Sequence, residues 1–378
     1  MPATDRATAQ PAVSVIVPAR NEEACLDACL QSLVDQSFAD QTPVDQGIVD
    51  FEIIVVDDHS TDRTHEIANS FAGQGVRVID AGPLPAGWTG KNNAVTAGAK
   101  AARGQWLLFT DADTIHLPGS LARSMKEVKR NGAAMLSYSP RQIVKSFWEK
   151  AVMPVIFAEL AASFRPSQVS DPKSVAAAAN GQYILISREA YDAVGGHAAI
   201  ATNLLEDVVL ARRVKQSSRK IFFRYGGDAV RTRMYRSFAQ LREGWNKNLA
   251  LLFPSPLRLA ALRATEFVLI VTSLAIAIAS RLRGRWQPAV ITAVLCVAVY
   301  GLFLRRVRRA HFPAEANVLA LFGLPLFSYL LLRSERSHRR GNVCWKGREY
   351  PGNRLTLESS TETDPATQEK HGLSHAQS

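Results

Sequence analysis

The chain has 378 residues, 45 Lys and Arg against 34 Asp and Glu, a formal net charge of +11, 47% hydrophobic residues and four cysteines. This composition excludes collagen-like, disulfide-stapled and wholly disordered chains, and the length suffices for a full α/β domain. The basic charge is compatible with nucleic acid, an anionic membrane surface or an anionic substrate, and its position along the chain decides among them.

The N-terminal part of the chain alternates between strand and helix patterns. Residues 1–12 are polar, so we expect a flexible N-terminus without a signal peptide or membrane anchor. Beyond them, strands are expected at residues 13–17, 52–56 and 106–110, and helices at 21–36, 61–72 and 92–102. Strands that alternate with helices predict a parallel sheet of βαβ units.

The following region, residues 115–257, has a mixed pattern. It contains an amphipathic stretch at 141–164, a strand at 181–187 and a short helix at 208–214. A polar insertion at 40–50 is expected to be a surface loop, and the apolar-poor tail at 351–378 is expected to be disordered. The four cysteines have neither metal-binding nor disulfide spacing, which is typical of idle thiols in a reducing compartment.

Three apolar segments follow residue 257, at 264–280, 288–304 and 316–332. Each has 17 residues and reaches roughly 25 Å as a helix, at the low end for a membrane span. Residues 258–340 are therefore expected to form a membrane region of about three hydrophobic helices, followed by the tail at 341–378. Glu266 and Pro325 leave a re-entrant or interfacial arrangement open for the first and third segments.

The basic charge lies mainly beside these apolar segments. Residues 258–340 hold 13 Arg, no Lys and three Glu, whereas residues 1–257 are nearly neutral. This distribution indicates an anionic membrane surface and no nucleic-acid partner. A basic, aromatic stretch at 231–247 contains Arg233 and Arg236 and lacks a nucleic-acid fold motif, so a diphosphate or a lipid headgroup is its preferred ligand.

Acidic pairs follow the expected strands, where ligands bind in open α/β sheets. Asp57 and Asp58 follow the second strand, Asp111 and Asp113 follow the third, and Glu206-Asp207 precedes a helix. A D-x-D turn can hold Mg²⁺ or Mn²⁺, which neutralises a leaving diphosphate, although turn-capping aspartates produce the same pattern. Lys91, near the start of a helix, is either a phosphate contact or a plain surface lysine.

The segments VSVIVPARNEE, EIIVVDDHSTD, WLLFTDAD and LLEDVVLARRV together resemble the family 2 glycosyltransferases of GT-A fold, over roughly residues 12–250. GWTGKNNA, GQYILISREAYDAVGGH and VCWKGREYP are similar to the membrane-bound branch that glycosylates carotenoids or accompanies hopanoid synthesis. The Q-x-x-R-W motif of processive polysaccharide synthases is not intact, since QLREGW is only a loose counterpart, which argues against polymer synthesis.

The resemblance implies a fold and an activity. The fold would be a GT-A domain, Rossmann-like, at residues 13–257, followed by C-terminal transmembrane helices. The activity would be inverting transfer of a sugar, glucose being expected, from a nucleotide-diphosphate donor to a lipid acceptor. The donor is expected to be a UDP-sugar, and the acceptor a carotenoid or another terpenoid.

The resemblance also implies roles for single residues. Asp207 would be the catalytic base, and Asp113 would hold a divalent metal, Mg²⁺ or Mn²⁺. A carboxylate-bearing acceptor would need little help from the base. The nucleotide-sugar would be bound by Pro18, Arg20, Glu22, Asp57 or Asp58, Lys91, Asp111, Arg233 and Arg236.

Several alternatives stay open. A polyprenyl-phosphate or polysaccharide glycosyltransferase is the second enzyme hypothesis, and a non-catalytic membrane scaffold that binds sugar nucleotides is disfavoured by the acidic set. We expect a multi-pass protein of the inner cell membrane with a cytoplasmic catalytic domain. Residues 345–348 either fold back to the active site, in which case one apolar segment does not span, or mark the membrane interface. His197 is either an acceptor contact or a structural turn residue.

Overall fold

The computed structural model describes residues 10–37 and 49–350. The part of the predicted tail at 351–378, most of the predicted flexible N-terminus at 1–12 and most of the predicted loop at 40–50 therefore lie outside the described residues. Its centre is a seven-stranded sheet in the order β3-β2-β1-β4-β8-β6-β9. The strands are β1 (Val13–Ala19), β2 (Phe51–Asp57), β3 (Val76–Asp80), β4 (Trp106–Phe109), β6 (Met135–Ser139), β8 (Ile184–Ser187) and β9 (Ile221–Tyr225).

The sheet is mixed rather than wholly parallel. Strands β3, β2, β1 and β4 run parallel, as the βαβ pattern predicted, but β8 is antiparallel to both of its neighbours, β4 and β6. The sequence analysis did not predict β3, β6 or β9, each of which has only five residues.

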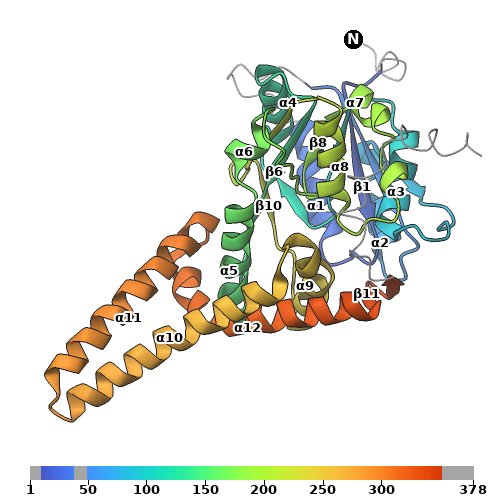
Figure 1. Ribbon diagram of the computed structural model, residues 1–378. Helices are drawn as coiled ribbons and strands as arrows, with labels where there is room; N and C mark the ends of the chain where they lie inside the picture. Colours follow the sequence, from blue (N-terminus) through green and yellow to red (C-terminus); the bar gives the residue numbers. More distant parts are fainter. Residues whose placement is uncertain (1–9, 38–48, 351–378) are drawn as a thin grey trace, which may run out of the picture.

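Helices cover both faces of the sheet, as Figure 1 shows. Val13, Val15 and Val17 pack on one face, against α1 (Leu26–Val34), α2 (Thr64–Ser70) and α4 (Ser120–Arg130). Residue Ile16 points to the opposite face, which is covered by α3 (Gly90–Ala101), α6 (Pro166–Ser170), α7 (Arg188–Ala193) and α8 (Glu206–Gln216). The alternation along β1 thus builds two cores from one strand.

The first helix begins later than predicted, at Leu26 instead of residue 21. Asn21 has a positive φ of 51°, and its side-chain oxygen accepts a hydrogen bond from the backbone N–H of Thr61 at 2.8 Å. Asn21 therefore joins the loops after β1 and β2 instead of capping α1. This junction fixes the two strand ends next to each other.

A second sheet of three short strands lies beside the carboxyl end of β4. It consists of β5 (Thr114–His116), β10 (Val230–Thr232) and β7 (Arg141–Gln142). The hydroxyl of Thr232 donates a hydrogen bond to the backbone carbonyl of Asp113 at 3.2 Å. The small sheet therefore brings the D-x-D turn next to the basic stretch that follows β10.

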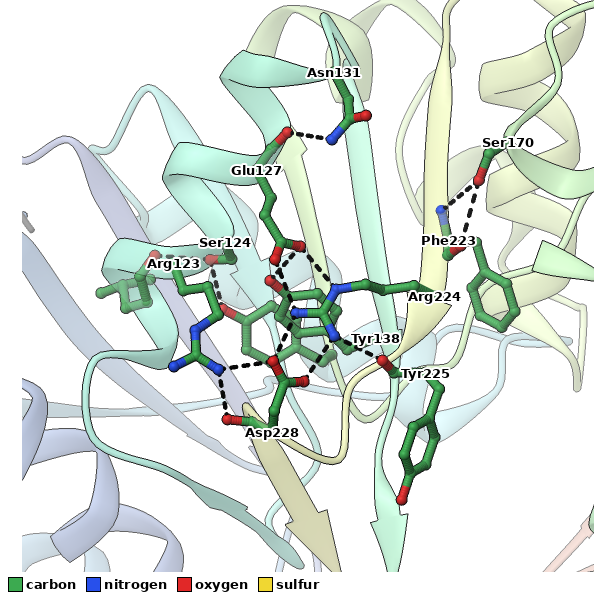
Figure 2. Close-up of polar contacts among 12 residues, drawn as sticks. Arg123, Ser124, Glu127, Asn131, Tyr138, Ser170, Phe223, Arg224, Tyr225 and Asp228 are labelled. Carbon is green, nitrogen blue, oxygen red and sulfur yellow. Dashed lines mark hydrogen bonds and ion pairs between the residues drawn. The ribbon is translucent and has the colours of Figure 1, made fainter. Parts of the chain in front are cut away.

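An ionic cluster ties α4 to the edge strand β9 (Figure 2). The guanidinium of Arg224 donates to both carboxylate oxygens of Glu127, each at 2.9 Å, and to Oδ1 of Asp228 at 2.7 Å. It also lies 4.4 Å from the ring centroid of Tyr138, whose hydroxyl donates to Glu127 at 2.9 Å. Arg224 and Glu127 are thereby paired at half-buried positions, while Asp228 is exposed.

A helical layer lies below the sheet in the view of Figure 1. It consists of α5 (Phe147–Ser163), α9 (Phe238–Leu252), α10 (Pro256–Leu282), α11 (Trp286–Val307), the 3₁₀ turn η5 (Arg308–Ala310) and α12 (Ala314–Arg340). Helix α12 packs along α5 and α9, while α10 and α11 form a helical hairpin that projects away from the sheet (Figure 1). Gly323 permits this packing, because a Cβ there would come within 1.9 Å of the Ala151 carbonyl oxygen.

The three C-terminal helices are long and apolar enough to cross a membrane. They are not equally exposed. Of an apolar 18-residue stretch in each helix, half is buried in the protein for α12, 22% for α10 and 11% for Trp286–Ala310, which contains α11. Large apolar side chains on the α10–α11 hairpin face outward, among them Ile276 and Ile291, which are 50% and 69% exposed. So large an unpartnered apolar surface indicates membrane association.

A charged cluster lies where the α10–α11 hairpin leaves the helical layer. Arg263 and Arg306 both pair with Glu159 of α5 and with Glu266, at distances of 2.7–3.3 Å. Glu266, which interrupted the first apolar segment in the sequence, is thus neutralised by two arginines. Its presence is compatible with an apolar hairpin.

Candidate active site

A cavity of about 760 Å³ lies between the carboxyl ends of the central strands and the helical layer. Every residue predicted for the site except Asp57 lines it, namely Pro18, Arg20, Glu22, Asp58, Lys91, Asp111, Asp113, Asp207, Arg233 and Arg236. These residues come from the ends of β1, β2 and β4, from the starts of α3 and α8, and from the segment after β10.

Asp57 faces away from this cavity. Its carboxylate accepts a hydrogen bond from the backbone N–H of Ser60 at 3.2 Å and lies 3.2 Å from Nδ1 of His65. Ligand atoms of Asp57, His65 and Asp80 lie within 4.8 Å of one another, a spacing that could hold a metal ion. Of the two candidates after β2, only Asp58 reaches the cavity.

Lys91 bridges two carboxylates at the centre of the site. The hydroxyl of Thr89 caps α3 by accepting from the N–H of Asn92 at 3.2 Å, and Lys91 follows in the first turn. Its ammonium lies 2.7 Å from Asp111 and 2.8 Å from Glu206. Burial opposes this charge, but the two carboxylates outweigh it and raise the pKa of Lys91 well above its ordinary value. Lys91 is therefore a fixed cation and not a plain surface lysine.

Asp113 has the properties expected of a metal ligand. Its Oδ1 is buried and has no hydrogen-bond partner among the described residues. Burial, together with the charges of Asp111 and Glu22, raises the pKa of Asp113 to about 7. A divalent cation would satisfy the free oxygen and offset this repulsion, so the residues present fit Mg²⁺ or Mn²⁺.

Asp207 is held in the first turn of α8. Its two oxygens accept hydrogen bonds from the backbone N–H groups of Gly181, at 3.0 Å, and Val208, at 2.8 Å. Burial and the adjacent charge of Glu206 raise the pKa of Asp207 to about 6. A carboxyl group with this pKa can take up a proton near neutral pH, which a general base requires.

Glu206 and Lys247 are site residues to which the sequence analysis gave no role. The pKa of Glu206 is held low, because Lys91 and Lys247 outweigh its burial. Burial lowers the pKa of Lys247, which lines the cavity from α9 near Glu206 and Asp207. The sequence shows the charge of each residue, but only the packing of α9 against the rest of the domain brings Lys247 close to Glu206.

The two predicted arginines have different surroundings. Arg233 donates to both oxygens of Glu149 at 3.0 and 3.2 Å, and Glu149 also caps α5. The charge of Arg233 is therefore already paired within the protein. Arg236 also lines the cavity.

One wall of the cavity is apolar. Phe157 and Leu160 of α5 contribute to it, together with Phe164, which directly follows α5, and Leu252 of α9. Next to them the rings of Tyr225 and His311 stack with centroids 4.1 Å apart. His311 follows η5, so this wall adjoins the connection between the projecting hairpin and α12.

His197 lies behind the site as a structural residue. Its Nδ1 lies 3.0 Å from the hydroxyl of Tyr191, and its ring meets Phe109 edge-on with centroids 4.9 Å apart. Burial lowers the pKa of His197 to about 4, so it is neutral. Of the two sequence interpretations, the structural turn is the one that these contacts favour.

A two-stranded hairpin from the C-terminal end of the described chain closes one side of the cavity. It consists of β11 (Val343–Trp345) and β12 (Arg348–Tyr350). Arg348 pairs with Asp58, and Lys346 pairs with Glu22. Residues 345–348 thus fold back to the site, one of the two arrangements that the sequence left open.

Comparison with known proteins gives a family and several relatives. Residues 14–195 match the model of glycosyl transferase family 2. The chain is 28% identical over 350 residues to a 4,4'-diaponeurosporenoate glycosyltransferase of Staphylococcus aureus strain MRSA252, covering 90% of this chain and 88% of the relative. The counterpart in strain USA300 is 27% identical with the same coverage.

Solved structures also resemble the chain at low identity. A mannosyltransferase from Pyrobaculum calidifontis, in complex with GDP-Man and Mn²⁺, is 15% identical, covers 87% of each chain and has a TM-score of 0.47.

Proposed function

The chain carries a family 2 glycosyltransferase domain of GT-A fold, and from this premise we propose that it transfers a sugar from a nucleoside diphosphate donor to a membrane lipid of carotenoid type. The acceptor class is suggested by the names of the relatives that match along nearly the whole chain. We propose a UDP-sugar as the donor, with glucose as the sugar.

One observation carries the proposal: a single cavity joins an acidic, cation-bearing side to an apolar wall. Asp58, Asp113 and Asp207 lie on the polar side, and the aromatic and aliphatic side chains of α5 form the apolar wall. The charged phosphates of the donor would bind on the polar side, and the lipid acceptor would bind at the apolar wall. Transfer between them requires that these two surfaces adjoin. The apolar wall adjoins the membrane helices, which suits an acceptor that arrives from the bilayer.

The donor would bind across the ends of β1, β2 and β4. Pro18, Arg20, Glu22, Asp58 and Asp111 would surround the nucleotide. A divalent cation held by Asp113 would neutralise the charge of the diphosphate. Lys91, paired with Asp111, would add a fixed positive charge beside it.

The reaction would be a single displacement with inversion. Asp207 would take the proton of an acceptor hydroxyl while its oxygen forms a bond to the anomeric carbon. The bond from that carbon to the β-phosphate oxygen breaks, and the electron pair leaves with the nucleoside diphosphate. An acceptor carboxylate has no proton to lose and would need less help from Asp207.

We further propose that the α10–α11 hairpin enters the inner membrane while α12 lies along its surface. Glu266 lies in the charged cluster where α10 leaves the helical layer, and Arg281 lies near the turn of the hairpin. The two residues are 15 positions apart, which corresponds to about 22 Å of helix. This length is short for a hydrocarbon core of about 30 Å, so Arg281, Arg283 and Arg285 would extend towards lipid headgroups. The catalytic domain and the β11–β12 hairpin would share the cytoplasmic side.

The test is a transfer assay with membranes that contain the full-length protein. The membranes are incubated with UDP-glucose and with either a carotenoid carboxylic acid, a hydroxylated carotenoid or a polyprenyl phosphate, and the products are identified by mass spectrometry. A glycosylated carotenoid that is absent with Asp113→Asn, and with Asp207→Asn when the acceptor is the hydroxylated carotenoid, supports the proposal. A sugar found only on the polyprenyl phosphate would refute the acceptor class, and no transfer from any nucleotide sugar would refute the activity.

A further inference from the structure

The β11–β12 hairpin is attached to the cavity mainly through charged contacts. Arg348 donates to both oxygens of Asp58, at 2.5 and 3.0 Å. The ammonium of Lys346 pairs with Glu22 and donates to the carbonyl of Arg20 at 2.9 Å. The backbone N–H of Lys346 donates to Glu243 of α9 at 2.9 Å.

The hairpin has little support of its own. Its strands have three residues each and pair with one another, in a sheet separate from the central one. An isolated two-stranded hairpin is at best marginally stable. Its position therefore depends on α9, on the ring of Trp345 beside Lys247, and on the carboxylates of the cavity.

The turn of the hairpin has an unfavourable residue at its first position. Lys346 has a φ of 47° and Gly347 a φ of 74°. Asn, Asp or Gly usually occupies such a position, since a long side chain disfavours the left-handed region. This backbone conformation aims the Lys346 side chain at Glu22, so the turn retains a cation at some conformational cost.

The opposite wall has room for the guanidinium of Arg348. Gly90 is the first residue of α3, directly before Lys91. A Cβ on Gly90 would lie 1.6 Å from Nη1 of Arg348 and 2.6 Å from Oδ2 of Asp58. Any other residue here would push the guanidinium away from Asp58.

The two hairpin cations shift the balance of side-chain charge around the cavity. Seven carboxylates and eight Lys or Arg side chains line it, and two of the eight are Lys346 and Arg348. Without the hairpin, the carboxylates outnumber the cations. The hairpin thus supplies two of the positive charges that an anionic donor would meet in the cavity.

We propose that the β11–β12 hairpin is part of the donor site and that Lys346 and Arg348 bind the diphosphate of the nucleotide. This inference rests on the proposed function, because it requires a nucleoside diphosphate donor. On binding, the two cations exchange Asp58 and Glu22 for phosphate oxygens, and Asp58 is released towards the nucleoside. A guanidinium suits this exchange, since it binds phosphate and carboxylate with the same two-pronged geometry.

The test is equilibrium binding of UDP and of GDP to the full-length protein in nanodiscs, by calorimetry, with Mg²⁺ present. We expect Arg348→Ala and Lys346→Ala each to weaken binding of the preferred nucleotide roughly tenfold to hundredfold, the loss typical of a charge-assisted contact. Arg348→Lys should restore only part of the affinity. Arg339→Ala is the matched control, because Arg339 lies on α12, is 61% exposed and pairs with Glu335.

A second variant separates binding from folding of the hairpin. Gly90→Ala leaves the hairpin sequence intact but displaces the guanidinium of Arg348, so it should weaken nucleotide binding as Arg348→Ala does. Unchanged or tighter binding in Arg348→Ala and Lys346→Ala would overturn the inference, and tighter binding would identify the hairpin as a competitor of the donor. If the unaltered protein binds neither UDP nor GDP, the proposed function fails together with the inference.

Discussion

The ammonium of Lys91 lies 2.8 Å from the carboxylate of Glu206, although the two residues are 115 positions apart in the chain. This pair joins the first turn of α3 to the first turn of α8. Glu206 is adjacent to Asp207, and Lys91 also pairs with Asp111 at 2.7 Å. Lys91 thus stands between the D-x-D turn and the proposed base, and its charge acts on both.

Replacing Lys91 by Met should shift the pH dependence of transfer. The positive charge of Lys91 lowers the pKa of Asp207, which is raised to about 6 by burial and by Glu206. Without that charge the pKa of Asp207 rises further, so the base becomes protonated at a higher pH. With a hydroxyl acceptor, the acidic limb of the kcat profile should move to higher pH in Lys91→Met. It should stay near its original place in Lys91→Arg, and an unmoved limb in Lys91→Met would contradict this coupling.

Asp207→Asn should separate hydroxyl acceptors from carboxylate acceptors. General base catalysis contributes roughly 10²–10⁴-fold, so kcat with a hydroxylated carotenoid should fall by about that factor. The loss with a carotenoid carboxylic acid should be much smaller, because that acceptor is already ionised. In the unaltered enzyme, kcat with the hydroxyl acceptor should fall as the pH drops below about 6, where Asp207 is protonated. Equal losses with both acceptors would contradict a base role.

Asp113→Asn should abolish metal-dependent transfer, and His65→Ala tests the competing site. Loss of a metal ligand at a charged leaving group costs several kcal/mol, so we expect at least about a hundredfold drop in kcat. His65, beside Asp57 and Asp80, belongs to the other possible metal group, which lies off the cavity. Titration with Mn²⁺, followed by electron paramagnetic resonance, should show a site that is lost in Asp113→Asn and retained in His65→Ala. The reverse pattern would move the catalytic metal to the Asp57 group.

Arg224→Met should lower stability without lowering activity. Arg224 is paired with Glu127 and Asp228 and does not itself line the cavity, and its removal leaves the half-buried Glu127 without its cation (Figure 2). We expect a loss of about 2 kcal/mol in the free energy of unfolding. Thermal unfolding followed by fluorescence should show a lower Tm, while kcat at low temperature stays unchanged. An unchanged Tm would show that the cluster contributes nothing net.

Cysteine labelling should show that the catalytic domain and the hairpin lie on one side of the membrane. Cys344 is exposed on β11 and can report the hairpin once the other three cysteines are replaced by Ala. Lys129→Cys on α4 reports the catalytic domain, and Arg283→Cys reports the turn between α10 and α11. A membrane-impermeant maleimide should reach Cys344 and Lys129→Cys from the same side only. If these two cysteines were labelled from opposite sides, the chain would cross the membrane an odd number of times between them, and the proposed arrangement would be refuted.

Much of the fold follows from local sequence pattern. The apolar runs around Val15 and Ile54 had to become buried strands, and the acidic residues after them had to lie at the edge of the sheet where strand ends meet. The three apolar segments after residue 257 were expected to be helices, and α10, α11 and α12 cover them. The family 2 glycosyltransferase domain that the sequence motifs predicted is confirmed by the family model that matches residues 14–195.

Only the tertiary structure decided which acidic residues face the cavity and what they meet. The sequence could not choose between Asp57 and Asp58, because adjacent strand residues point to opposite faces and the register decides. The sequence also does not predict that Arg348 pairs with Asp58, 290 positions away in the chain. Nor does it predict that half of the apolar stretch of α12 is buried in the protein. Local periodicity determines whether a segment is buried, whereas contacts between charged side chains depend on how distant elements dock, and one helix can present the same apolar pattern to lipid or to protein.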